Sequence, residues 1–189
     1  MNQGLIIMML DADQSLLLII DVQERLMPVM DQPNEIVRSI KILSEAASVL
    51  DMPVMITEQH PKALGSTIEN IDANEKLNTV SRFEKMHFSA FKDTAFQSAI
   101  HQSGRRQVVV SGIESHICVL QTALDLVNQG YHVFIVADAV TSRTSESKKL
   151  ALSRMANAGA EIVNAEMVLF EWLGKAGTDQ FRSLSKLIK

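Results

Sequence analysis

Short apolar runs alternate with longer stretches of helical periodicity along this chain. Leu16–Ile20 is continuously apolar and ends at Asp21, and Ile36–Leu50 then repeats apolar residues at spacings of three and four. A short apolar run between polar residues predicts a strand buried on both faces, whereas the longer periodic stretch predicts an amphipathic helix. By the same criteria, further strands are predicted over residues 54–57, 79–83, 108–110, 131–138 and 161–163, and further helices over residues 93–102, 118–129, 145–158, 168–173 and 179–188.

This order of elements predicts an α/β fold with three layers. Strands and helices that alternate along a chain form a mostly parallel sheet with right-handed crossovers, so that helices cover both of its faces. We therefore expect a Rossmann-like α/β/α architecture around a six-stranded, mostly parallel sheet. Ligands bind at the carboxyl ends of the strands in such sheets. Five residues with chemically useful side chains follow predicted strands and are expected at that edge: Asp21, Glu58, Lys85, Cys118 and Asp138.

Length and composition favour one domain that acts on a small molecule. The 189 residues, 47% of them hydrophobic, suit a single domain over residues 1–189, with residues 1–10 as a candidate N-terminal extension. A net charge of −4, with basic residues clustered only in pairs, argues against a nucleic-acid partner. The chain contains no apolar stretch of membrane-spanning length and no charge pattern of a signal peptide. Together with a single cysteine, which excludes an internal disulfide, these features predict a cytoplasmic protein.

The glycine motifs that bind nucleotides in many α/β sheets do not occur in this sequence. Neither G-x-G-x-x-G nor G-x-x-x-x-G-K-[ST] is present, and Gly112 stands alone in its predicted turn. Because such loops supply the backbone N–H groups that cradle phosphates, their absence argues against dinucleotide binding.

Cys118, the only cysteine, lies where the predicted strand over residues 108–110 gives way to a helix. Unpaired N–H groups and the positive end of the dipole at a helix start favour a thiolate, which is the nucleophilic form of cysteine. This position makes Cys118 a candidate nucleophile. Alternatively, Cys118 is a small buried hydrophobe, as lone cysteines in soluble proteins commonly are.

Three segments at predicted strand ends carry a family resemblance. They are Leu18–Gln23, which contains Asp21; Phe83–Phe91, which contains Lys85; and Ser111–Val119, which contains Cys118. In this order, and with Asp138 ending the fifth predicted strand, they resemble the isochorismatase-like cysteine hydrolases, and the resemblance runs almost end to end. Residues 57–67 are similar to those of the subgroup called isochorismatase domain-containing proteins.

The resemblance implies a catalytic triad. Cys118 would be the nucleophile that forms a covalent intermediate, and Asp21 would be the general base. Lys85 would hold Asp21 ionised and stabilise the thiolate. The resemblance also implies a cis peptide bond between Ile113 and Glu114, with the backbone N–H groups of Glu114 and Cys118 forming an oxyanion hole.

We expect a substrate pocket at this edge of the sheet, without a metal ion or another cofactor. The pocket residues would be Gln23, Glu58, His60, Phe88 and Ile113. Metal-binding members of the superfamily use an aspartate and several histidines after the second strand, whereas this chain keeps only Glu58 and His60 there. Two ligands do not make a closed metal site, so no metal is expected.

The predicted function is hydrolysis of a small amide or related carbonyl substrate. The alternative is a catalytically silent or redox-sensing oligomeric protein that keeps the fold. We expect His116, two residues before Cys118, to be a packing residue rather than the catalytic base. We also expect a homo-oligomer, dimeric or larger, with an exposed apolar stripe on the C-terminal helix as its interface: Phe181, Leu184, Leu187 and Ile188.

Overall fold

Strands and helices alternate from the N-terminus to the C-terminus, as the hydrophobic pattern predicts. The structure, a computed structural model, describes residues 8–72 and 80–188. The strands are β1 (Ser15–Ile20), β2 (Val54–Gln59), β3 (Val80–Lys85), β4 (Gln107–Ile113), β5 (His132–Thr141) and β6 (Glu161–Val163). The α-helices are α1 (Pro33–Val49), α2 (Pro61–Leu64), α3 (Glu69–Asp72), α4 (Thr94–Gln102), α5 (Leu120–Asn128), α6 (Ser145–Asn157), α7 (Ala165–Leu173) and α8 (Asp179–Leu184). None of the helices in the described ranges is long and apolar enough to cross a membrane.

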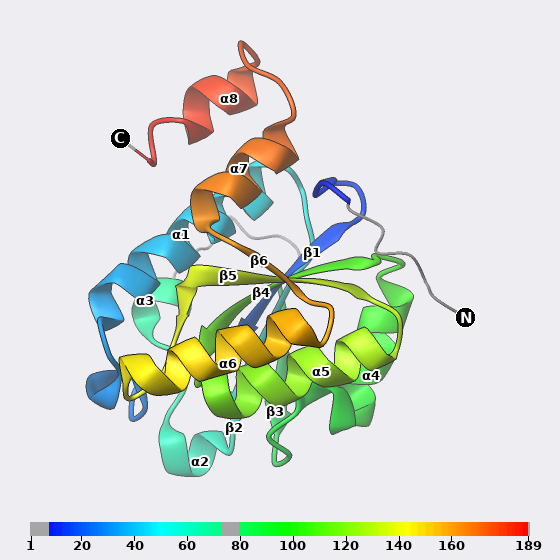
Figure 1. The fold of residues 1–189 in the computed structure, drawn as a ribbon. Coiled ribbons are helices and arrows are strands. Elements are labelled where there is room, and N and C mark those ends of the chain that lie inside the picture. Colours follow the sequence, from blue (N-terminus) through cyan, green and yellow to red (C-terminus); the bar gives the residue numbers. More distant parts are fainter. Residues whose placement is uncertain (1–7, 73–79, 189) are drawn as a thin grey trace.

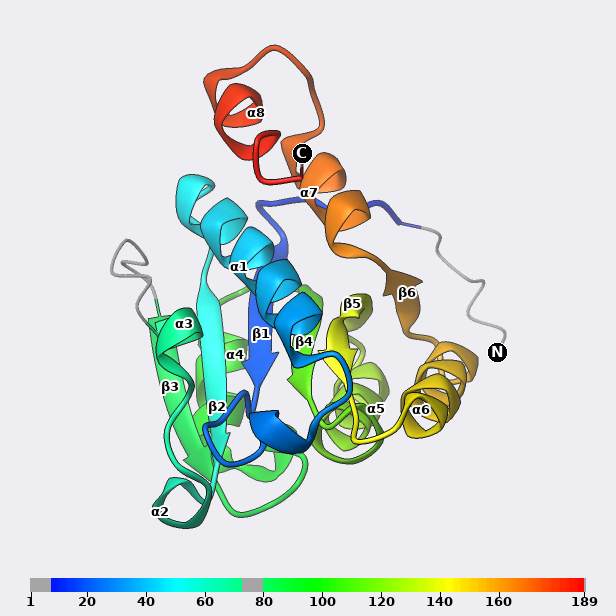
Figure 2. The same cartoon turned by 90° about the vertical axis from the view of Figure 1, so that its left-hand side faces the viewer.

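The six strands form one sheet in the order β3-β2-β1-β4-β5-β6, and every neighbouring pair is parallel. Helices α1, α3, α7 and α8 lie on one side of the sheet, and α4, α5 and α6 lie on the other (Figures 1 and 2). The predicted three-layer α/β/α fold is therefore confirmed. The order reverses between β1 and β4, and the crevice at such a reversal is where open α/β sheets bind ligands.

The apolar runs of the strands are explained by burial on both faces of the sheet. Leu17 and Ile19 of β1 belong to the core cluster under α1 and α7, whereas Leu16 and Leu18 belong to the cluster on the opposite face. Successive side chains of a strand point to opposite faces, so a strand with helices on both sides is apolar at every position. This central burial makes β1 a fixed support for the residue that follows it.

Asp138 does not lie at the carboxyl edge of the sheet, so this expectation is wrong. Strand β5 continues past Asp138 to Thr141, and its register with β4 shifts between Val110 and Gly112. The Asp138 carboxylate accepts a hydrogen bond of 2.8 Å from the N–H of Ala165, the first residue of α7. A carboxylate at this position satisfies an unpaired helix donor, so Asp138 stabilises the start of α7.

The predicted interface stripe near the C-terminus is also wrong. Helix α8 ends at Leu184, which is fully buried, and Leu187 and Ile188 pack against the same core cluster as α1. The apolar spacing does mark a buried face, but these side chains cover α1 and α7 of their own chain. At the other terminus, residues 1–7 of the candidate extension lie outside the described residues, whereas Leu10 is buried and its N–H donates to Glu171.

Gly112 allows β1 and β4 to approach each other just before the candidate site residues Asp21 and Cys118. It pairs with Ile20, and its φ of +116° is a conformation that residues with a side chain rarely adopt. A Cβ atom added at Gly112 would lie 2.1 Å from the carbonyl oxygen of Ile20. Because that oxygen belongs to the backbone of a buried strand, it has no room to move away.

We predict that Gly112→Ala lowers the free energy of unfolding by about 3 kcal/mol or more, through steric overlap added to an unfavourable φ. The matched control is Gly104→Ala, at φ +66°, where an added Cβ meets none of the described atoms within 4 Å. That variant should lose only about 1–2 kcal/mol, the usual cost of the left-handed conformation. Urea denaturation measures both values, and equal losses would show that the close approach at Gly112 is unimportant.

Candidate active site

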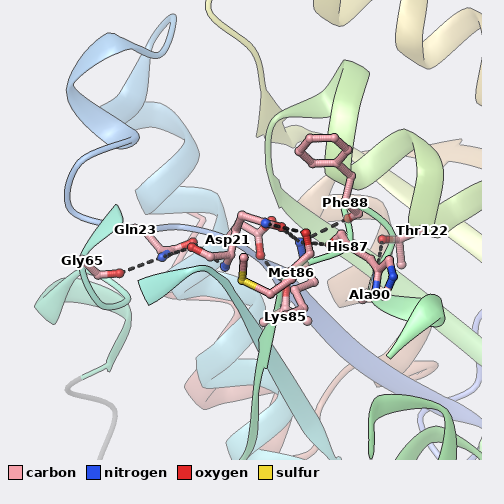
Figure 3. Close-up of polar contacts among 11 residues, drawn as sticks. Asp21, Gln23, Gly65, Lys85, Met86, His87, Phe88, Ala90 and Thr122 are labelled. Carbon is pink, nitrogen blue, oxygen red and sulfur yellow. Dashed lines mark hydrogen bonds and ion pairs between the residues drawn. The ribbon is translucent and has the colours of Figure 1, made fainter. Parts of the chain in front are cut away.

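Asp21 and Lys85 form a buried ion pair at the carboxyl edge of the sheet. Asp21 directly follows β1, and Lys85 is the last residue of β3. The Lys85 Nζ atom lies 2.7 Å from the Asp21 Oδ2 atom, and both side chains are fully buried (Figure 3). Since β2 lies between β1 and β3 in the sheet, the pair joins two strands that are not neighbours. Neither charge has solvent to stabilise it, so each depends on the other.

Neutral groups complete the surroundings of the pair. The Thr57 hydroxyl donates to the second carboxylate oxygen of Asp21 at 2.8 Å. The Lys85 ammonium also donates to the side-chain oxygen of Gln59 at 2.8 Å. It donates in addition to the backbone carbonyl oxygens of His87 and Phe88 at 3.3 and 3.1 Å. Neither Thr57 nor Gln59 is among the site residues predicted from the sequence, although Thr57 ends a predicted strand and Gln59 lies two residues beyond it.

Cys118 completes the group from the other side of β1. It lies in a short π-helix, Ser115–Val119, that follows β4 and leads into α5. Only 7% of the residue is exposed. The charges of Asp21 and Lys85 both act on its thiol. The three residues predicted as a triad are therefore brought together at one edge of the sheet.

The environment favours the thiol form of Cys118, contrary to the expectation of a thiolate. Burial is the largest effect, and together with the negative charge of Asp21 it raises the pKa of Cys118 to about 12. The positive charge of Lys85 acts in the opposite direction but does not compensate. The effect of desolvation on the thiol pKa therefore exceeds the stabilisation of the thiolate expected from the start of a helix. At neutral pH the proton therefore remains on Cys118, and the Asp21 carboxylate is a nearby proton acceptor whose charge acts on this thiol.

Two of the predicted pocket residues hold the loop between β2 and α3. The Gln23 side chain is fully buried and donates to the carbonyl oxygens of Gln59 and Gly65 at 3.0 and 2.7 Å (Figure 3). The Glu58 carboxylate accepts two hydrogen bonds from Thr67, one from its N–H and one from its hydroxyl. These polar groups are already paired within the protein, so their role in this structure is to shape the loop.

The other predicted pocket residues differ in exposure. Ile113 is fully buried, and its peptide bond to Glu114 is cis. His60 is exposed, and Phe88 is 54% exposed with its ring directed away from the ion pair (Figure 3). Phe88 lines a surface hollow of about 540 Å³ between its loop and α5, and the other lining residues include Met86, Ser89, Gln121, Leu124 and Asp125.

His116 and His60 are two histidines near the candidate site, and their surroundings differ. The Nδ1 atom of His116 lies 2.9 Å from the Ser142 hydroxyl, so this ring packs against the turn after β5, as predicted. No third potential ligand among the described residues joins His60 and Glu58. Among residues 8–72 and 80–188, no group of three or more His, Cys, Asp or Glu side chains is arranged to hold a metal ion.

Comparison with known proteins assigns the family. Residues 15–167 match the family model described as the isochorismatase domain. The chain belongs to the isochorismatase family. It is 38% identical over 177 residues to a protein named secreted isochorismatase effector Isc1 from Phytophthora sojae, covering 93% of this chain and 84% of that relative. It is 37% identical over 174 residues to isochorismatase domain-containing protein 2 from Xenopus laevis, covering 92% and 83% of the two chains.

Solved structures of similar proteins support the same fold for this isochorismatase-family chain. A structure named MAR1 ribonuclease from Caenorhabditis elegans has a TM-score of 0.88 and 32% identity, covering 96% of this chain and 92% of that one. The YcaC gene product of Escherichia coli, described as an octameric hydrolase of unknown specificity, has a TM-score of 0.88 and 20% identity, covering 95% and 90%. At 20% identity the second likeness concerns the fold alone.

The charges around Cys118 predict opposite effects of two substitutions on its reactivity. Asp21→Asn removes the charge that raises the thiol pKa, so alkylation by iodoacetamide at pH 8 should become about tenfold faster. Lys85→Met removes the opposing positive charge, so alkylation should slow by a similar factor. The labelling rate is measured by intact mass, which is unambiguous because the chain has one cysteine.

Wild-type alkylation should also keep accelerating from pH 7 to pH 10 without a plateau, because a thiol with a pKa of about 12 is mostly protonated throughout this range. A plateau near neutral pH would show a preformed thiolate and would contradict this description of the site. Circular dichroism of each variant verifies that the fold is retained.

Proposed function

We propose that this protein is a cysteine-dependent hydrolase that acts on a small amide or related carbonyl compound. The observation that carries the proposal is the convergence of a nucleophile, a base and a fixed positive charge. Cys118, Asp21 and Lys85 come from three different parts of the chain, and all three are buried at one edge of the sheet. A nucleophile that contacts a base held by a third group is the arrangement required for covalent catalysis.

In the proposed first step, Asp21 accepts the proton of the Cys118 thiol as the sulfur bonds to the substrate carbonyl carbon. Lys85 stabilises the negative charge that passes from carboxylate to sulfur. The backbone N–H groups of Glu114 and Cys118 donate to the developing oxyanion. The C–N bond then breaks, the leaving nitrogen takes the proton from Asp21, and the acyl group remains on Cys118 as a thioester.

In the second step, water attacks the thioester. Asp21 accepts a proton from this water as the oxygen bonds to the carbonyl carbon, and the C–S bond then breaks. The sulfur recovers the proton and the acid product leaves. No redox equivalent is consumed in either step.

Burial of the site favours a small, uncharged substrate. Among the described residues, the charges that act on Cys118 are those of Asp21 and Lys85, and they neutralise each other. A charged substrate would lose its hydration without gaining an opposite charge. Ile113 is proposed to form the apolar wall of the pocket, with His60 and Phe88 at its mouth, while Gln23 and Glu58 act indirectly by holding the adjoining loop.

Two other activities have less support from the site. Redox-sensing cysteines are exposed and have a lowered pKa, whereas the pKa of Cys118 is raised and the residue is 7% exposed. One solved relative is named a ribonuclease. The net charge of −4 of this chain and the absence of basic clusters in its sequence do not favour a polyanionic substrate.

A substrate screen tests the proposal. Small amides, carbamoyl compounds and esters are incubated with wild type and with Cys118→Ala, and product is quantified by mass spectrometry. We expect at least one compound to be hydrolysed by the wild type and kcat/KM to fall by about a thousandfold or more in the variant. Acid quenching during turnover should trap a mass increase equal to the acyl group.

Hydrolysis that survives in Cys118→Ala would contradict the covalent mechanism. Absence of turnover across the whole panel, with an intact thiol and a folded protein, would favour the catalytically silent alternative. A single-stranded RNA oligonucleotide included in the panel tests the activity for which the ribonuclease relative is named.

We also propose that the protein is a homo-oligomer whose interface lies on α7, beside Phe181 but away from the buried Leu184 of the predicted stripe. Met167 and Phe170 lie one turn apart on α7 and are both exposed, and the ring of Phe170 lies 6.3 Å from that of Phe181. Exposed apolar groups that lie together commonly mark interfaces.

Sedimentation equilibrium at micromolar concentration should give a mass of at least twice the 20.9 kDa of one chain. Phe170→Asp should reduce that mass if α7 forms the interface. A wild-type mass equal to that of one chain would reject the oligomer. If Phe170→Asp has the same oligomeric mass as the wild type, only the interface on α7 is rejected.

A further inference from the structure

The ion pair of Asp21 and Lys85 joins the ends of β1 and β3, and β2 lies between these two strands. Gln59, the last residue of β2, is in register with Lys85 of β3. Its side-chain oxygen accepts a hydrogen bond of 2.8 Å from the Lys85 ammonium. Its side-chain nitrogen donates at 2.9 Å to the carbonyl oxygen of Met86, the residue after Lys85. The two ends of one amide thus contact the catalytic lysine and the loop that follows it.

The backbone of Gln59 is held as firmly as its side chain. The N–H of Gln59 donates to the side-chain oxygen of Gln23 at 2.8 Å, and the carbonyl oxygen of Gln59 accepts from the side-chain nitrogen of Gln23 at 3.0 Å. Gln23 is fully buried and also binds the carbonyl oxygen of Gly65 (Figure 3). One glutamine therefore fixes the backbone of the other, so that the side chain of Gln59 starts from a defined position.

The acceptors around Lys85 outnumber its three N–H donors. Asp21, Gln59, His87 and Phe88 each provide an oxygen within 3.3 Å of Nζ, and the thiol of Cys118 interacts with the same ammonium. When several acceptors compete for three donors, losing one leaves no unpaired N–H but changes where the ammonium rests. The contribution of Gln59 is therefore to the position of the charge.

We infer that Gln59 is a positioning residue that holds the Lys85 ammonium close to Cys118 and couples it to the loop bearing Met86 and Phe88. The inference rests on the proposed function of Lys85 as the charge that stabilises the cysteine sulfur. Gln59 is suited to this role because its amide is neutral. It orients the ammonium without adding a negative charge that would compete with Asp21 or oppose thiolate formation.

The test is a double-mutant cycle on the reactivity of Cys118. Gln59→Met keeps the length of the side chain and removes both polar contacts. We expect alkylation by iodoacetamide at pH 8 to slow about threefold to tenfold, and the pH dependence to move upward by up to about one unit, because the positive charge moves away from the sulfur. In a Lys85→Met background the same substitution should have no further effect, since Gln59 acts through Lys85.

The matched control is Gln97→Met. Gln97 lies on α4, and its side-chain nitrogen donates at 2.6 Å to the carbonyl oxygen of Phe91, so it also ties a glutamine to a backbone carbonyl in the segment after β3. Among the described residues it has no hydrogen bond to Asp21, Lys85 or Cys118. Gln97→Met should leave the alkylation profile of Cys118 unchanged. An equal effect of both glutamine variants would show a general loosening of the loop and would overturn the inference.

Two further outcomes would also overturn it. One is an alkylation profile for Gln59→Met that matches the wild type, and the other is a Gln59 effect that persists in full when Lys85 is already methionine. If Gln59→Met does not fold, Gln59→Asn takes its place in the cycle, because it keeps the amide but is too short to reach the ammonium.

Alkylation requires no substrate, so this test is separate from that of the proposed function. A Lys85-dependent effect of Gln59 without any hydrolytic turnover would support the positioning role and reject the hydrolase. Hydrolytic turnover by the wild type, with an alkylation profile that Gln59→Met leaves unchanged, would support the hydrolase and reject the positioning role.

Discussion

The buried ion pair between Asp21 and Lys85 is the constraint on which the rest of the site depends. Both side chains are fully removed from solvent, with their charged atoms 2.7 Å apart. Removing two charges from water costs several kcal/mol for each ion, and only close pairing with additional hydrogen bonds offsets that cost. The strand ends, the loop after β3 and the polar residues of β2 must therefore be arranged so that neither charge is left without partners.

This constraint also determines the state of the nucleophile. The burial that strengthens the ion pair raises the pKa of Cys118, because a thiolate in the same place would be a second, uncompensated negative charge. The site thus holds a protonated thiol beside the ion pair of Asp21 and Lys85. A protonated thiol is a weak nucleophile, and its burial limits the access of oxidants. Hydrolysis accounts for these properties better than redox sensing does.

Family membership and fold do not identify the substrate. Relatives of this chain carry names as different as a secreted effector and a ribonuclease, although the solved ribonuclease shares the fold with a TM-score of 0.88. A shared fold supplies the sheet edge, and the loops that surround it select the ligand. In this chain the residues with the most freedom to do so are the exposed side chains of His60, Met86 and Phe88 on the loops after β2 and β3.

The sequence alone determined the order of elements and three residues of the site. Continuous apolar runs such as Leu16–Ile20 are local signals, since a strand covered on both faces is apolar at every position. Asp21, Lys85 and Cys118 could be selected because they lie at or just beyond strand ends and match a family pattern. Each of these signals is contained within a few consecutive residues, so it can be read without knowing the fold.

Only the tertiary structure decided which polar groups meet and how strongly they are buried. Because β2 lies between the strands that carry Asp21 and Lys85, its residues Thr57 and Gln59 contact the ion pair. Strand β5 continues past Asp138, so Asp138 lies away from the site. The raised pKa of Cys118 and the burial of Leu184 also arise from neighbours far away in the sequence. Periodicity reports which face of an element is apolar, but the partner that covers this face is set by long-range packing.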